Sequence, residues 1–225
     1  SGASHHVVVE ECKLEVNKFF ALNGMMDIYQ ESAENWHIDS DWENIYVHTD
    51  LVPYLQSLFP ENRFDLPLIV ENLERLAYSG SIQVYPQQLL MSGLISSAPG
   101  VCQTNVNFKY DSIASTFDCQ AFVETPSLDL AQLLDNEMFS GNSAFNVRID
   151  AKHLGDSRYK ALAEANIDRF AFNDYQYKDI SLQADLDGKG LYKANIDADD
   201  DNCKLVADFQ LDARGERSDW TLTGD

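Results

Sequence analysis

The sequence predicts a mainly β protein built from amphipathic antiparallel strands, and three observations lead to this fold class. Residues 145–222 alternate apolar and polar side chains with the period of two that places one row on each face of a strand. Turn residues separate these segments, as at Gly188-Lys189-Gly190 and Asp200-Asp201-Asn202. Helical spacing is confined to a few short stretches. The pattern therefore indicates a chain whose main feature is a two-sided sheet surface.

The predicted strands run through most of the chain. Ala165 and Ile167 are at odd-numbered positions, whereas Phe170 and Phe172 are at even-numbered ones. All four can lie on one face of a strand only if an extra residue is inserted, so we expect a β-bulge near Asp168-Arg169. We expect a turn at Asn23-Gly24 between the first two strands. The strands are predicted at residues 7–16, 25–29, 82–85, 88–95, 101–110, 115–124, 145–151, 165–172, 180–187, 192–199 and 203–212.

A helical insertion at residues 50–78 interrupts this pattern. Thr49 or the aspartate after it can cap a helix from Leu51 to Leu58. The spacing predicts a second helix from Leu66 to Ala77 and one further helical turn at Leu128–Leu134. We expect these two or three short helices to cover one end of the apolar face and to protect strand edges there.

Composition and charge exclude several classes of protein. Apolar residues make up 44% and aromatic residues 11% of the 225 residues, which is enough to fold. The chain has 16 Lys and Arg against 37 Asp and Glu, a formal charge of -21. This charge repels phosphates, so nucleic-acid binding is excluded. No run approaches the ~20 apolar residues of a membrane-spanning helix.

The four cysteines, Cys12, Cys102, Cys119 and Cys203, lack the spacing of a zinc or redox site. A turn at residues 111–114 would place Tyr110 opposite Ser115 and Cys119 opposite Val106, leaving Cys102 about 13 Å away along the strand. That separation exceeds the reach of a disulfide. We therefore predict free, buried cysteines.

No pattern in the chain predicts catalysis, a cofactor or a metal. Asp197, Asp199 and Asp201 have the spacing that opens a calcium-binding loop, but Asn202 and Asp208 replace its glycine and its final glutamate. We interpret this segment as a solvated hairpin turn. The five histidines are scattered, and no nucleophile elbow or phosphate-binding loop is present. Tryptophans that could form a sugar-stacking platform are dispersed, which favours core or edge positions: Trp36, Trp42 and Trp220.

A series of weaker elements, read together, resembles a known family. Between residues 45 and 215 the chain contains Asp50-Leu51, Leu58-Phe59-Pro60, Leu66-Pro67, Tyr78-Ser79-Gly80, Phe122 to Leu134, Phe145 to Ala151, Ala165 to Ile180 with a Tyr-x-Tyr-Lys-x-Ile segment, and an Asp-rich turn within 197–205. This order is similar to the Bacteroidetes-type repeat region of the translocation and assembly module (TamB, AsmA-like) family.

The resemblance implies an elongated, curled antiparallel sheet of the β-taco type, open along an apolar groove. It implies a non-enzymatic envelope protein that carries phospholipid between the inner and outer membranes or assists outer-membrane protein assembly. Residues 1–225 would be one β-rich segment of a longer periplasmic repeat protein. An inner-membrane anchor and the contact with an outer-membrane barrel partner would lie in other parts of that protein. Phospholipid acyl chains would slide passively along the groove.

The groove candidates are the apolar rows of the last third, and a packed core is the alternative interpretation. Such rows look the same in a β-sandwich, and a secreted β-sandwich that binds glycans is the alternative function, with a hydrolase third. The candidate lipid-contacting residues are Phe145, Val147, Ile149, Ile180, Leu182, Leu186, Tyr192, Ile196, Leu205, Phe209 and Leu211.

Overall fold

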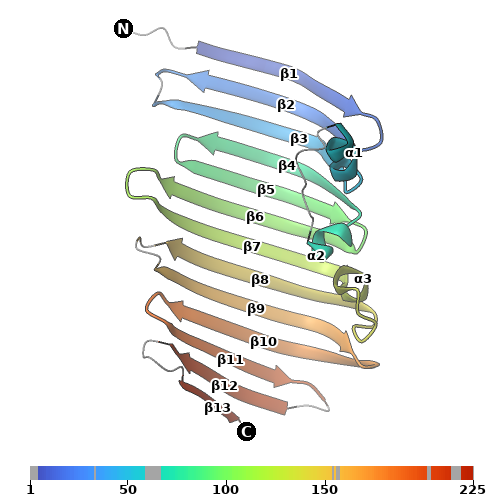
Figure 1. The fold of residues 1–225 in the computed structure, drawn as a ribbon, viewed down its shortest axis with the longest axis vertical. Coiled ribbons are helices and arrows are strands. Elements are labelled where there is room, and N and C mark those ends of the chain that lie inside the picture. The colour runs from blue at the N-terminus through green and yellow to red at the C-terminus, as the bar shows by residue number, and fades with distance from the viewer. Residues whose placement is uncertain are drawn as a thin grey trace.

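The structure, a computed structural model, describes residues 5–32, 34–58, 67–153, 155, 158–201, 204–213 and 219–224. Thirteen strands and three short helices make up this part of the chain (Figure 1). The strands are β1 (His5–Val16), β2 (Phe20–Gln30), β3 (Trp36–His48), β4 (Arg75–Tyr85), β5 (Gln88–Ser97), β6 (Gly100–Asp111), β7 (Thr116–Asp129), β8 (Asn142–His153), β9 (Tyr159–Phe172), β10 (Tyr175–Asp187), β11 (Leu191–Asp199), β12 (Lys204–Asp212) and β13 (Asp219–Gly224). The helices are α1 (Leu51–Leu58), α2 (Leu68–Glu71) and α3 (Leu130–Leu134).

All thirteen strands form one antiparallel sheet in their sequence order, and this sheet is not closed into a barrel. Each strand pairs with the strands before and after it in the chain, so the sheet extends in one direction from β1 to β13 (Figure 1). All three helices lie at the end of the sheet where the odd-numbered strands finish, which we call the helical end. The predicted fold class, an elongated open sheet with short helices, is confirmed.

The period-two alternation gives the sheet one apolar face and one polar face. Residues that are directly opposite across a strand pair share a face. One row of such partners is apolar on every strand from β1 to β12: Val7, Ile28, Ile38, Val84, Leu89, Phe108, Cys119, Ala151, Ala161, Leu186, Tyr192 and Leu211. We call the side that carries this row the apolar face and the other side the polar face.

Three local predictions are confirmed. Helix α1 spans Leu51–Leu58, as its spacing predicted. The hairpin at residues 188–190 forms with positive φ at both glycines, and the Asp187 carboxylate accepts hydrogen bonds from the amides of Lys189 and Leu191. A bulge lies at Asp168, because Phe145 pairs with Ile167 whereas Ala144 pairs with Arg169. This bulge returns Phe170 and Phe172 to the apolar face.

The second helix was predicted too long. Helix α2 covers only Leu68–Glu71, and Arg75 already belongs to β4. The connection that holds α1 and α2 is therefore residues 49–74, not an insertion reaching residue 78. Leu76 pairs with Val47 on one side and Ser97 on the other, so cross-strand pairing overrides its helical spacing. The third helix is also shorter than predicted, since β7 continues to Asp129.

The turn predicted at Asn23-Gly24 is wrong, because both residues lie inside β2 and the first hairpin turns at residues 17–19. The ladder between β2 and β3 shifts register at this point. A Cβ on Gly24 would clash with the carbonyl oxygen of Asp41 and come within 2.7 Å of the Trp42 ring. Glycine is needed here for close approach of a neighbouring strand and its indole, not for a reversal of the chain.

The register predicted for β6 and β7 is also wrong. Tyr110 pairs with Phe117 and Cys119 pairs with Phe108, two residues away from the predicted partners Ser115 and Val106. The Asp111 carboxylate accepts hydrogen bonds from the amides at positions 113 and 114, which makes the turn four residues long. Cys12, Cys102 and Cys119 are free as predicted, but they are half-buried instead of buried. Cys203 lies outside the described residues.

The sheet has very little core. In the described part of the chain the buried hydrophobic residues are Tyr78, Leu128, Ala144 and Ala198. The chain exposes 14883 Å², whereas a compact monomer of 25.4 kDa is expected to expose roughly 10,300 Å². Most apolar side chains of the sheet therefore contact neighbouring strands on the same face and have no second layer above them.

Candidate functional site

The structure brings all eleven candidate residues onto the apolar face of β8 and β10–β12. They occupy adjacent rows of directly opposed residues, with alanines and Ile167 completing the rows. The first row contains Phe145, Ile180 and Leu205, the second Val147, Leu182 and Ile196, the third Ile149 and Phe209, and the fourth Leu186, Tyr192 and Leu211.

These side chains are more exposed to solvent than is usual for apolar residues that are directly opposite one another in neighbouring strands. The exposed fractions are 38% for Ile149, 42% for Tyr192, 37% for Ile196 and 39% for Leu205. Water removal from such a surface is favourable by about 25 cal/mol for each Å² of apolar area. The face is therefore a surface that gains free energy when an apolar ligand or partner covers it.

The same face continues through the N-terminal two thirds of the sheet, which the candidate list did not include. A second row passes through Leu22, Ile45, Tyr78, Ile95 and, next to the bulge in β6, Cys102. The alternation that identified the later strands is present here, but small residues interrupt it. The small residues Gly24, Gly80, Gly93 and Thr104 form one row across β2–β6, in which Trp42 is the one large side chain.

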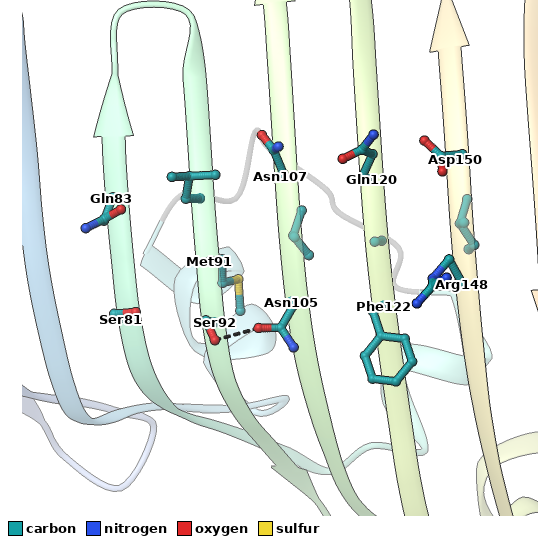
Figure 2. A pocket seen from close by; sticks show the side chains of 14 residues that line it. Ser81, Gln83, Met91, Ser92, Asn105, Asn107, Gln120, Phe122, Arg148 and Asp150 are labelled. Atoms are coloured by element: carbon teal, nitrogen blue, oxygen red, sulfur yellow. Dashed lines mark hydrogen bonds between the residues drawn. The ribbon is translucent and has the colours of Figure 1, made fainter.

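Among the described residues, the helices cover the apolar face only at the helical end. Figures 1 and 2 view opposite faces: the helices are in front of the strands in Figure 1 and behind them in Figure 2. Tyr54 of α1 stacks on Phe19 with ring centroids 5.1 Å apart. Phe139, in the segment after α3, packs on Phe170 at 5.8 Å and Phe172 at 5.3 Å.

Side-chain hydrogen bonds connect and stabilise the helices that cover this end of the apolar face. The Asn72 side-chain amide, just after α2, donates to the carbonyl of Leu133 in α3 at 3.0 Å. Asp129 caps α3 by accepting from the Gln132 amide at 3.0 Å. Two helices from connections far apart in sequence are thus joined above the apolar face, and no other helix among the described residues lies over the rest of that face.

Chemically reactive groups are few on this face. Burial raises the pKa of the Cys102 thiol, and a hydrogen bond with Thr125 opposes the rise. Burial raises the pKa of Cys119 as well, with the nearby carboxylates of Asp118 and Asp150 adding to it. Both thiols are therefore held in the unreactive protonated form at neutral pH.

The acidic turn after β11 is a structural element. Asp200 is only 2% exposed, and its carboxylate accepts hydrogen bonds from the Tyr175 hydroxyl and, at 3.0 Å, from the Lys178 amide. Asp199 forms an exposed ion pair with Lys204 at 2.9 Å. The prediction of a solvated hairpin turn is therefore wrong in part: Asp197 and Asp199 belong to β11, and Asp200 is buried and holds the end of β11 against β10. Across the described residues, no group of three or more His, Cys, Asp or Glu side chains is arranged to hold a metal ion.

The tryptophans do not form a platform. Trp36 pairs with Gln30, whereas Trp42 lies over Gly24 and donates its indole N–H to Ser40 Oγ at 2.9 Å. The side chain of Trp220 lies outside the described residues. None of the helices in the described ranges is both long and apolar enough to cross a bilayer.

Comparison with known proteins gave no family model, curated protein or solved structure that matches this chain. The interpretation of the apolar face therefore rests on its geometry and on the sequence resemblance alone.

Proposed function

We propose that this chain is a non-enzymatic segment of a periplasmic, bridge-like envelope protein, and that its apolar face binds phospholipid acyl chains and lets them pass between the inner and outer membranes. The observation that carries the proposal is the unbroken apolar row from Val7 to Leu211 across twelve strands. At a strand spacing of ~4.8 Å, this row is about 50 Å long. Its length and direction suit a path better than a pocket.

The energetics favour a ligand that slides. A methylene group removed from water gains about 0.8 kcal/mol, so an acyl chain with one side on the sheet gains roughly half of that per methylene. Every position along the row offers a similar apolar contact, because the residues are all apolar and half-buried or exposed. Binding is then favourable everywhere and no single site traps the chain. A polar headgroup can stay in solvent, since the sheet is not closed.

The same face is compatible with a role in assisting outer-membrane protein assembly, where the ligand would be an apolar segment of another protein. The alternative function, a glycan-binding β-sandwich, requires two sheets packed face to face. All thirteen strands belong to one sheet, and the apolar rows of β8–β12 have no second sheet over them in the described residues. The geometry therefore favours lipid over this alternative.

A lipid extraction experiment tests the proposal. The chain is produced in bacteria, purified without detergent and extracted with organic solvent, and phospholipid per protein is measured by mass spectrometry. Leu182 and Ile196 are directly opposite on the apolar face, so the variant Leu182→Gln with Ile196→Gln places two amides in the middle of the path. We expect co-purified phospholipid in the wild type and a several-fold loss in this variant.

The matched control changes the other face of the same two strands. Ser181 lies on the polar face of β10 and Asn195 on that of β11, so Ser181→Gln with Asn195→Gln should retain lipid. Circular dichroism checks that both variants keep their strand content. Lipid-free wild-type protein would overturn the proposal, whether it is a monomer or a dimer that buries the apolar face between two copies. Equal lipid loss in both variants would also overturn it.

A further inference from the structure

The polar face has its own hollow, on the opposite side from the apolar path. This hollow has a volume of about 660 Å³ and lies over β4–β8. Two adjacent rows of opposed residues line it, together with Met91, Val106, Ala121 and Ile149 (Figure 2). The first row contains Gln83, Leu90, Asn107, Gln120 and Asp150, and the second Ser81, Ser92, Asn105, Phe122 and Arg148.

The lining mixes apolar side chains with uncharged hydrogen-bonding groups. Ser92 Oγ donates to Asn105 Oδ1 at 2.6 Å, and Gln88 Nε2 donates to Asn107 Oδ1 at 2.9 Å. These bonds fix the oxygen side of both asparagines and leave their NH₂ groups as oriented donors. The side chains of Gln83 and Gln120 form no hydrogen bond with any other described residue. The hollow thus presents the NH₂ groups of four carboxamides and the carbonyl oxygens of Gln83 and Gln120 to a ligand.

The charge of the hollow differs from that of the whole chain. The chain has a formal charge of -21, but the only ionised side chains among the described residues lining this hollow are Arg148 and Asp150, which cancel. Such a surface attracts neither anions nor cations. Phe122 adds a half-buried aromatic ring between the amides of Asn105 and the guanidinium of Arg148. Carboxamides, hydroxyls and one aromatic ring together suit a ligand with many hydroxyl groups and an apolar ring face.

We infer that this hollow binds a linear, uncharged oligosaccharide lying across β4–β8. The five strands give a row about 19 Å long at ~4.8 Å per strand, with a polar group or the Phe122 ring on each successive strand. A bound peptide fits less well, because an extended peptide is recognised by unpaired backbone groups at a sheet edge and this hollow is in the middle of the sheet. Ile149 of the proposed lipid path also borders the hollow, but the polar side chains and the Phe122 ring that would hold the saccharide lie on the other face.

Titration followed by NMR tests the inference. Cellotetraose, maltotetraose and tetra-N-acetylchitotetraose are added to the ¹⁵N-labelled chain at millimolar concentration, and amide shifts are followed. We expect saturable shifts confined to β4–β8 with at least one of these probes. Gln120 is exposed, so Gln120→Ala should fold normally and weaken that binding about fivefold to tenfold, the effect of losing one hydrogen bond. Phe122→Ala should weaken it at least as much.

The control for these variants is Gln183→Ala, which removes a carboxamide from the same face on β10, outside this hollow. It should leave the affinity unchanged, as should the apolar-face variant at Leu182 and Ile196. The inference is overturned if none of the three saccharides shifts these amides. It is also overturned if Gln120→Ala binds as tightly as Gln183→Ala. Loss of lipid binding without loss of saccharide binding would separate the two sites.

Discussion

Substitution of Gly80 by alanine should destabilise the centre of the N-terminal half of the sheet. A Cβ at this position would be 2.5 Å from the Gly93 Cα and 3.0 Å from the Ser92 carbonyl carbon, and closer still to the Ser92 oxygen. These atoms belong to the backbone of the paired strand β5, so no side chain can rotate to make space. The φ of +147° adds a conformation that alanine rarely adopts.

The two effects can be estimated separately. A residue with a side chain in a left-handed conformation costs about 1–2 kcal/mol, and overpacking costs about 1–3 kcal/mol. The sum for Gly80→Ala is about 2–5 kcal/mol. Gly155 has a φ of +81°, and a Cβ placed on it would meet no atom of another described residue within 4 Å, so Gly155→Ala should show the conformational cost only. The difference between the two variants then measures the crowding between β4 and β5.

Urea unfolding followed by tryptophan fluorescence gives the free energy of unfolding of each variant. Trp42 is directly opposite Gly80, so its emission reports on this region. Hydrogen exchange should show the loss of protection mainly in β3–β6, because strands contact chiefly their sequence neighbours. If Gly80→Ala is no less stable than Gly155→Ala, the close approach of the two backbones does not constrain this position and the reasoning fails.

Three further predictions concern buried and half-buried side chains that contact the sheet. Tyr78→Phe removes hydrogen bonds to the Ser81 and Ser92 carbonyls and should cost about 1–2 kcal/mol at neutral pH. Burial raises the pKa of Tyr78 above its unfolded value near 10. The stability that the hydroxyl contributes is therefore complete below pH 10 and is lost as the pH rises further. Urea unfolding at increasing pH should show the free energies of unfolding of wild type and Tyr78→Phe converging. The thiols of Cys102 and Cys119 should react with iodoacetamide more slowly than the thiol of N-acetylcysteine does, and phospholipid bound to the apolar face should slow them further. Rates equal to that of N-acetylcysteine would contradict the partial burial of these thiols on the apolar face. Phe139→Ala should cost about 1.5–2.5 kcal/mol, half the value for a fully buried ring, and hydrogen exchange should rise first at the β9–β10 turn. No change there would show that this ring does not anchor the segment after α3.

The sequence was most informative where local chemistry determined the structure. The glycines at 188 and 190 adopt the positive φ that their hairpin needs, and the parity change between Ile167 and Phe170 predicted the bulge at Asp168. The eleven apolar candidates share a face because period-two alternation and antiparallel register leave no other arrangement. The class of fold and the position of these candidates could therefore be predicted.

The remaining features depended on contacts that a single strand does not encode. Leu73, Leu76 and Ala77 fit a helix by spacing, yet pairing with β3 and β5 makes the last two part of a strand. Asn23-Gly24 resembles a turn, but the neighbouring Trp42 ring requires the missing side chain. The hollow on the polar face was not predicted, since it is formed by carboxamides from five strands and no spacing within one strand identifies it.

The neighbour-only order of the strands has a consequence for how the chain acquires its structure. Contacts between residues close in sequence carry a small loop-closure entropy, so a sheet in which β1 to β13 follow one another has low contact order for an all-β protein. Each hairpin can add to those already formed as the chain leaves the ribosome or a translocon. Gain or loss of a hairpin should then change the length of the sheet without changing its fold, so the length of the apolar row can vary by whole hairpins.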